Sequence, residues 1–275
     1  MMNELRERLG RTRRVTTPWS DDGTRGVTGA SLDELLDRWA NGYDWGVHER
    51  RIGELPWVTV AVGGTELHVI HQRSEDPSAP VVVLLHGWPD SVLRFERVLP
   101  LLTDMHVVVP ALPGFPFAAP LTTPGMSVSR IAGIVANALD ELGYSRYTVS
   151  GGDVGGTVAE ILAAEHPDRV AALHLTDISP RHALTADPAK LAPDAAAYLG
   201  RAAQWFRTEG GYIAEQSTRP NTLAVALGDS PARSAPRSPP TPNQSPSPTG
   251  SRRRPCSPCS RTTSNRRRAA TPRRS

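Results

Sequence analysis

An acidic residue flanked by glycines stands in the middle of a turn at residues 150–156 (SGGDVGG). An extended run, residues 147–149, precedes the turn, and a helical run follows it. A strand-to-helix turn of this kind holds its central residue, here Asp153, in a strained and exposed conformation. Only small neighbours two positions before and after it, Gly151 and Gly155, avoid a clash there. A carboxylate so placed can attack carbon and form an ester, so the turn indicates displacement at an electrophilic carbon such as an epoxide or an alkyl halide.

A second turn, residues 86–89 (HGWP), follows the apolar run 81–85. After a strand in this kind of fold, the backbone N–H behind the glycine points at the nucleophile. Two backbone donors then form an oxyanion hole, and we expect them to be Trp88 and Val154. A tight turn without a chemical role is the alternative, but the turn around Asp153 favours the functional interpretation.

Extended and helical patterns alternate along the chain. Such elements are needed to hold the two turns in place. The expected strands are a hairpin, 56–62 and 66–70, and the apolar runs 81–85, 105–109, 147–149 and 170–175. The expected helices are 31–39, with Ser31 as its N-cap, 92–102, 128–143, 158–164, 195–210 and 212–227, the last broken at Pro220. Residues 41–45 are expected to form a turn. The alternation predicts an α/β fold with a mostly parallel sheet.

The composition changes abruptly near Ala232. Residues 232–275 contain 11 arginines, 9 prolines and 9 serines, and they contain no acidic residue. Because the whole chain carries +3, the first 231 residues carry a net charge of −8, which does not favour a nucleic-acid partner. The tail cannot bury apolar area, so we expect it to be disordered. We interpret it as the product of a shifted reading frame, with a natural basic tail as the alternative.

Both cysteines, Cys256 and Cys259, lie in this tail. A lone CxxC does not supply the four ligands of a zinc site, so we expect no metal and no cofactor. The absence of cysteine from the first 231 residues fits a reduced cytoplasm. The first 14 residues lack the apolar core of a signal peptide, and no run is apolar for long enough to span a membrane.

Taken together, the motifs resemble those of epoxide hydrolases of the microsomal type, which have the α/β-hydrolase fold. The resemblance covers about residues 3 to 231. The segments that carry it are 43–45 (YDW), the hairpin through Ile70 and His71, 86–89 (HGWP), 110–115 (PALPGF), 151–156 (GGDVGG), 209–212 (EGGY), 217–222 (STRPNT) and 226–231 (ALGDSP).

This resemblance implies a sheet with helices on both faces, an N-terminal meander and a helical cap that is partial here. The implied domains are the meander at 1–75, the hydrolase core at 76–180, the partial cap at 181–231 and the tail at 232–275. It also implies a mechanism in two steps: Asp153 opens the epoxide to a hydroxyalkyl ester, and water then hydrolyses this ester to a vicinal diol. Tyr212 stands where the family places the first of two cap tyrosines that donate hydrogen bonds to the ring oxygen.

The departures from the family concern the second step. The resemblance places the general-base histidine near the C-terminus, beyond residue 231, and none of the eight histidines lies there. The orienting acid and the second tyrosine would come from the same region. In some relatives the orienting acid stands at the position of Asp177, but without the histidine an acid there has nothing to orient. We therefore expect the C-terminal part of the fold to be incomplete, with poor folding and little turnover.

Three other interpretations remain open. A haloalkane or haloacid dehalogenase has the same turn, but it usually carries a tryptophan after the nucleophile, where this chain has Val154. A non-catalytic remnant would also fit the missing histidine. The arginine runs 252–254 and 266–268 could bind phosphates, but without interleaved aromatics a specific nucleic-acid role is not expected. The expected partners are therefore a small epoxide and water, with no membrane; a homodimer is left open.

Overall fold

The computed structural model describes residues 2–12, 28–178, 182, 185–187 and 190–228. The chain divides into two units, Met1–Pro242 and Asn243–Ser275, and all described residues belong to the first. The predictions for the basic tail, which concern Cys256, Cys259, the arginine runs and the change of frame near Ala232, lie outside the described residues. The predicted domain boundaries at 75, 180 and 231 stay predictions.

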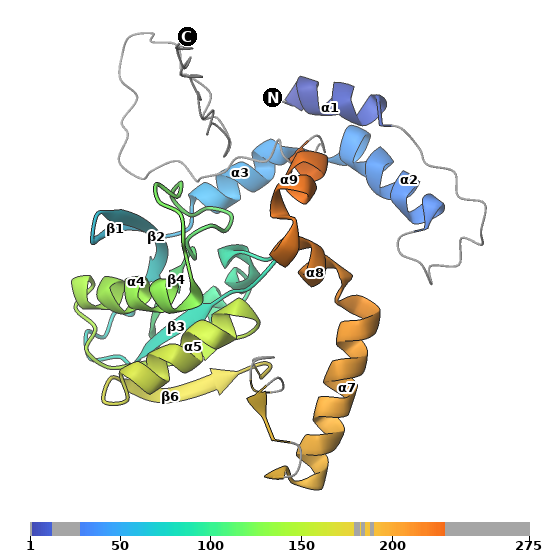
Figure 1. Ribbon diagram of the computed structural model, residues 1–275. Coiled ribbons are helices and arrows are strands. Elements are labelled where there is room, and N and C mark those ends of the chain that lie inside the picture. The colour runs from blue at the N-terminus through green and yellow to red at the C-terminus, as the bar shows by residue number, and fades with distance from the viewer. Residues whose placement is uncertain (1, 13–27, 179–181, 183–184, 188–189, 229–275) are drawn as a thin grey trace, which may run out of the picture. The chain divides into compact units, whose positions relative to one another are not determined.

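A hairpin forms one edge of a six-stranded sheet (Figure 1). Strands β1 (Trp57–Val62) and β2 (Thr65–Gln72) pair antiparallel, as their alternating sequence predicts, and β2 pairs antiparallel with β4 (His106–Pro110). Gly63 and Gly64 make the turn with φ values of +54° and +79°. Residues other than glycine rarely adopt these φ values, so the two glycines determine where the hairpin reverses.

The remaining strands are parallel, as predicted. β3 (Val81–Leu85) lies between β4 and β5 (Tyr147–Gly151), and β6 (Val170–Leu175) pairs with β5. The spatial order is therefore β1-β2-β4-β3-β5-β6. This order brings the carboxyl ends of β3, β5 and β6 to the same edge of the sheet. The turns that follow these three strands consequently lie close together.

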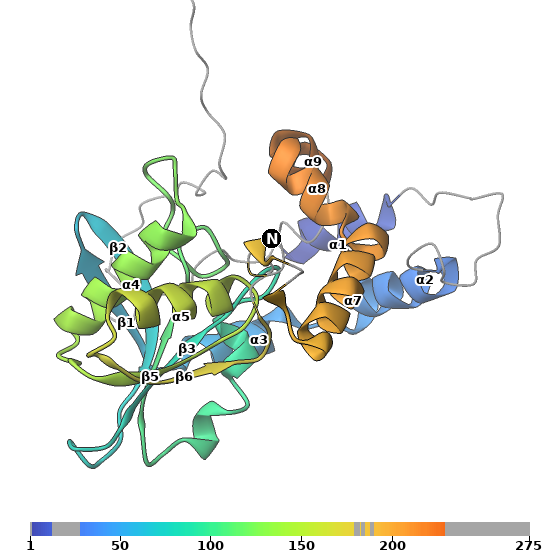
Figure 2. The same cartoon turned by 60° about the horizontal axis from the view of Figure 1, so that its bottom comes forward.

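One face of the sheet is covered by α4 (Val128–Glu141) and α5 (Val154–Glu165), which lie side by side in Figure 2. Their apolar side chains join the strand residues in one buried cluster, which includes Val83 and Val149. Ser127 caps α4 by accepting a hydrogen bond from the Arg130 N–H. Each valine or leucine fully buried here contributes about 1.5–3 kcal/mol to folding.

The opposite face carries α3 (Trp45–Gly53), whose Ile52 is buried in a second apolar cluster with Val107 and Val109. The prediction of one helix over residues 92–102 is wrong. The structure has two short 3-10 turns there, Val92–Phe95 and Leu99–Leu101. Pro100 explains the interruption, since its ring lacks an N–H and would clash with a carbonyl four residues earlier in an α-helix.

The N-terminal region contains helices that the sequence pattern predicted only in part. α1 (Met2–Gly10) has no counterpart among the expected helices. α2 (Gly29–Asp37) begins two residues before Ser31, and Thr28 caps it by accepting the Ser31 N–H at 3.1 Å. The prediction of Ser31 as the N-cap is therefore wrong.

The expected turn at 41–45 overlaps a π-helical turn, Arg38–Gly42, and the non-helical residues Tyr43 and Asp44 separate that turn from α3. Asp44 caps α3 by accepting the Gly46 N–H at 2.9 Å. The pattern did not reveal α3, because the short helix has one fully buried position rather than an apolar stripe.

The predicted cap helices are present as α7 (Pro193–Glu209), α8 (Gly211–Thr218) and α9 (Pro220–Gly228). The break expected at Pro220 is confirmed, since Pro220 begins α9, where its missing N–H has no partner to lose. Within the described ranges, no helix combines the length and the apolar character that a membrane crossing requires.

Strand β2 carries a buried histidine, His71. The His71 ring is 6% exposed, and its Nε2 lies 2.7 Å from the Tyr144 hydroxyl. Burial, with smaller contributions from Arg73 and His106, lowers the pKa of His71 to about 4. Histidine in an unfolded chain titrates near pH 6.5. Between these two values the unfolded chain therefore binds a proton that the folded chain excludes.

We expect this difference to make the free energy of unfolding fall as the pH drops from about 6.5 to 4. A His71→Gln variant should lose up to about 1.4 kcal/mol per pH unit of that slope in the middle of the window. Urea unfolding at a series of pH values measures it. Tyr144→Phe is the matched control, because it keeps His71 buried and should keep the slope; an equally steep slope in His71→Gln would contradict the prediction.

Candidate active site

The turn after β5 has the backbone geometry that the sequence predicted. Asp153 stands between Gly151, the last residue of β5, and Val154, the first residue of α5, with φ +54° and ψ −127°. A residue with a side chain rarely adopts a positive φ, and holding it there costs about 1–3 kcal/mol. The surrounding structure must supply this energy through its contacts with Asp153.

Close backbone contacts explain the two glycines around Asp153. A Cβ on Gly151 would lie 2.4 Å from the Gly155 carbonyl oxygen, and a Cβ on Gly155 would lie 2.3 Å from the carbonyl oxygen of Leu85 at the end of β3. No side chain, not even a methyl group, fits between these atoms. The glycines therefore let β3, β5 and the start of α5 approach one another.

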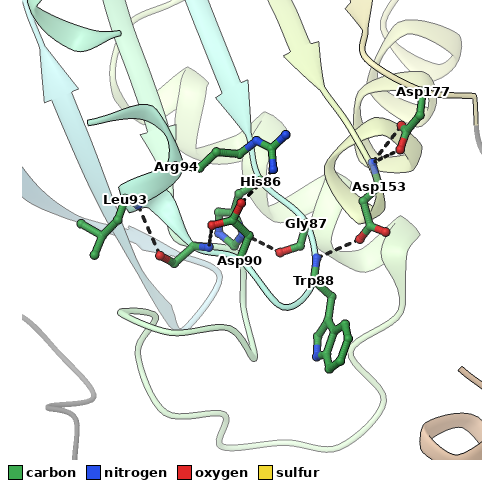
Figure 3. A network of polar contacts seen from close by, with 9 residues as sticks. His86, Gly87, Trp88, Asp90, Leu93, Arg94, Asp153 and Asp177 are labelled. Atoms are coloured by element: carbon green, nitrogen blue, oxygen red, sulfur yellow. Dashed lines mark hydrogen bonds and ion pairs between the residues drawn. The ribbon is translucent and has the colours of Figure 1, made fainter. Parts of the chain in front are cut away.

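The carboxylate of Asp153 meets the second predicted motif. The backbone N–H of Trp88 donates a hydrogen bond to Asp153 Oδ1 at 2.8 Å (Figure 3). A Cβ on Gly87 would lie 2.5 Å from the Asp153 side chain, so glycine is required for this approach. Val154, the other expected donor, begins α5, and its N–H is one of those that a helix leaves without an internal acceptor. Trp88 is thus brought to Asp153, while the oxyanion role of both residues stays a prediction.

Asp177 contacts the backbone of Asp153. Both of its carboxylate oxygens accept the Asp153 N–H, at 2.9 and 3.0 Å (Figure 3). Sequence reasoning considered Asp177 only as an acid for a histidine and missed this contact. A signal was available: Asp153 and Asp177 each follow a strand by two residues, and β5 and β6 are parallel neighbours. Residues beyond the carboxyl ends of such strands meet.

A cavity of about 430 Å³ opens at this edge of the sheet. Its walls are formed by residues 87–90, Arg94, Gly152, Asp153, Thr176 and Asp177. The volume falls in the range of small-molecule sites. Carboxylates dominate the charged groups of the cavity, but no group of three His, Cys, Asp or Glu in the described part of the chain could hold a metal ion.

Sequence reasoning did not single out Asp90 and Arg94, which form an ion pair at 2.8 Å in the cavity wall. Burial acts to raise the pKa of the Asp90 carboxyl, but hydrogen bonds from Arg94 and Ser91 and the positive charge of Arg94 oppose it, and the pKa lies below its ordinary value. The pair is half-exposed, so its contribution to stability is at most about 1 kcal/mol. Arg94 thus adds a positive group to a cavity that is also lined by Asp153 and Asp177.

None of the eight histidines is among the residues that line this cavity in the described structure. His86 is buried, and its Nε2 accepts the backbone N–H of Leu112. His174 contacts the Ser150 hydroxyl, and His182 contacts Glu160. The expected lack of a general base at Asp153 stays a prediction.

Tyr212, the predicted donor from the cap, lies on α8 and stacks on the Trp88 indole, with ring centroids 5.2 Å apart and planes inclined by 10°. Trp88 thus contacts Asp153 through its backbone and Tyr212 through its side chain. Tyr212 is 38% exposed. The structure brings the three predicted residues into one chain of contacts, and the donor role of the phenol stays a prediction.

Comparison with families of known proteins gives two matches. Residues 80–220, about half of the chain, match the model described as alpha/beta hydrolase fold, and residues 1–95 match the model described as epoxide hydrolase N terminus. The first range contains Trp88, Asp153 and Tyr212. The second contains the N-terminal helices, the hairpin and the turn at 86–89. The two ranges together cover nearly all of the described residues.

Individual relatives agree with these matches. The chain is 36% identical over 248 residues to a putative epoxide hydrolase of Stigmatella aurantiaca (strain DW4/3-1), covering 85% of this chain and 56% of that protein. It is similar in structure to Aspergillus niger epoxide hydrolase, with a TM-score of 0.74, 26% identity and coverage of 83% and 63% of the two chains. It is also similar to the crystal structure of juvenile hormone epoxide hydrolase from the silkworm Bombyx mori, with a TM-score of 0.69 and 26% identity. This match covers 84% of this chain and 57% of that chain. The chain spans about half the length of the curated relatives it matches.

We expect Gly155→Ala to disrupt the turn, because the added methyl group would overlap the backbone of Leu85 and His86. Overpacking against backbone atoms that cannot move aside should lower the free energy of unfolding by about 2–3 kcal/mol, if the chain folds at all. Gly133→Ala in α4 is the control, since a Cβ there meets no atom within 4 Å and should stabilise the helix by about 0.5–1 kcal/mol. Equal effects of the two substitutions in thermal unfolding would contradict this account.

Asp177→Leu should destabilise the fold by about 1–2 kcal/mol, because the Asp153 N–H loses its charged acceptor while the strained φ remains. Asp177→Asn keeps one acceptor oxygen and should lose less than half as much. Urea unfolding of the two variants beside the unaltered chain measures the difference. If Asn and Leu were equally destabilising, the hydrogen bond would not be the reason that Asp177 matters.

Proposed function

The chain belongs to the alpha/beta hydrolase fold family and to the epoxide hydrolases within it, and we propose that it opens a small epoxide by forming an ester on Asp153. The observation that carries the proposal is the Asp153 carboxylate in a 430 Å³ cavity, on a positive-φ turn and hydrogen-bonded to a backbone N–H. A buried structural aspartate would not need this strained and accessible position.

In the first step, Asp153 attacks a ring carbon of the epoxide. A lone pair of the carboxylate forms the new C–O bond, and the ring C–O bond breaks with its electrons going to the ring oxygen. The Trp88 N–H on Oδ1 orients the carboxylate for this attack. Tyr212 donates a hydrogen bond to the departing oxygen, and this donor is needed because carboxylate is a modest nucleophile. Stacking on Trp88 supports its placement near the site.

In the second step, water attacks the ester carbonyl and releases the diol. The N–H groups of Trp88 and Val154 stabilise the oxyanion of the tetrahedral intermediate. This step needs a base, and no histidine lines the cavity in the described residues. Loss of such a group costs about 10²- to 10⁴-fold in rate. We therefore propose that the second step is impaired in this chain and that the ester accumulates.

The proposed partners are a small epoxide and water. Two relatives are named as juvenile hormone epoxide hydrolases, so a juvenile hormone epoxide is one substrate to test. A cytoplasmic location and a homodimer stay predictions.

Styrene oxide incubated with the full chain should leave one covalent adduct on Asp153, detected by intact mass and located by peptide mass spectrometry. Because the ester accumulates, the adduct should form at least about a hundredfold faster than diol is released. Asp153→Ala should give no adduct.

A haloalkane substrate in the same experiment tests the dehalogenase alternative, which predicts release of chloride. An adduct on another side chain, or chloride release faster than epoxide opening, would contradict the proposal. A monodisperse sample that forms diol at the full rate would contradict the impaired second step.

A further inference from the structure

We infer that His86 is a positioning residue for the Gly87–Trp88 peptide and that its ring aims the Trp88 N–H at the nucleophile. The inference rests on the proposed function of Asp153 and adds a residue to it. His86 lies directly after β3 and is 1% exposed, so it does not reach substrate. Its action on the site therefore passes through the backbone next to it.

Two donors hold the carbonyl group of Gly87. His86 Nδ1 lies 3.3 Å from the Gly87 oxygen, and the Asp90 N–H donates to the same oxygen at 3.1 Å. The Gly87 carbonyl and the Trp88 N–H belong to one planar trans peptide, so they point in opposite directions. Fixing the carbonyl therefore fixes the N–H, which donates to Asp153 Oδ1 at 2.8 Å (Figure 3).

The tautomer of His86 follows from its other contact. The Leu112 backbone N–H donates to His86 Nε2 at 3.1 Å, so this nitrogen carries no proton. Burial, the largest influence, lowers the pKa of His86 and so favours the neutral ring. A neutral ring without a proton on Nε2 carries it on Nδ1, which then donates to Gly87. Phe115 packs edge-on against the ring at 5.2 Å and holds its plane.

This peptide needs such support because of Gly87 itself. Position 87 must be glycine, since a Cβ would lie 2.5 Å from the Asp153 side chain. Glycine, however, leaves the backbone free to rotate, and a rotated peptide would turn the Trp88 N–H away from the carboxylate. The donors from His86 and Asp90 restrict this rotation. Close approach and fixed orientation are thus supplied by different residues.

Two substitutions separate the two hydrogen bonds of His86. His86→Asn keeps a donor at the place of Nδ1 and loses the acceptor for Leu112. His86→Gln keeps an acceptor at the place of Nε2 and loses the donor to Gly87. We expect Asp153 to react with styrene oxide about tenfold more slowly in His86→Gln than in His86→Asn, the effect of about one hydrogen bond. Free energies of unfolding, measured beside the rates, should be similar for the two variants.

A purely structural role predicts rates that follow stability, and equal rates at equal stability would overturn the inference. A second measurement does not depend on catalysis. In the full chain labelled with ¹⁵N, His86 should carry its proton on Nδ1, and the Trp88 amide should exchange faster in His86→Gln than in His86→Asn. A proton on Nε2 would overturn the inference. If the unaltered chain forms no adduct, the proposed function fails, and the tautomer and the Trp88 amide still decide the role of His86.

Discussion

The conformation of Asp153 depends on contacts from two other parts of the chain, the end of β3 with the turn behind it and the turn after β6. Its positive φ is unfavourable for a residue with a side chain, and no neighbour in sequence offsets the strain. Trp88 holds the carboxylate, Asp177 holds the backbone N–H, and close packing against β3 leaves no room for another path of the chain. Each of these groups follows a strand, so the order of the parallel strands is what assembles the site. The sheet thus brings together the three turns that follow β3, β5 and β6.

The parts of the fold that follow from local constraints could be predicted from the sequence. Strands with continuous apolar runs, such as Val81–Leu85, appear with the predicted bounds, and the hairpin reverses at its two glycines. The turn around Asp153 was predictable because its glycine spacing has a steric cause. The helix over 92–102 was predicted wrongly, because apolar spacing was given more weight than Pro100. Helix α3 escaped notice because a short helix with one buried residue leaves no periodic pattern.

The candidate site was predictable in its residues but not in its hydrogen bonds. Trp88, Asp153 and Tyr212 were identified from motifs, and the structure places them in contact one after another. Asp177 and the ion pair of Asp90 and Arg94 were missed, because their importance comes from distances across the sheet edge rather than from a local pattern. The hydrogen bonds of His86 were likewise not predictable, because its ring binds a backbone group 26 residues away. Predicting such contacts requires the register of the strands, which the periodicity of apolar residues does not reveal.

Strand β6 has a consequence for the behaviour of the chain in solution. It is the last strand of the sheet in the described structure, and residues 171–174 are exposed, including Leu173 at 41%. An apolar strand with one unpaired edge offers its N–H and carbonyl groups to any other extended segment. Molecules of this chain can therefore join edge to edge, and this association becomes more favourable as their concentration rises. Dilution, rather than a change of substrate, would then be the first requirement for observing chemistry at the nearby carboxylate.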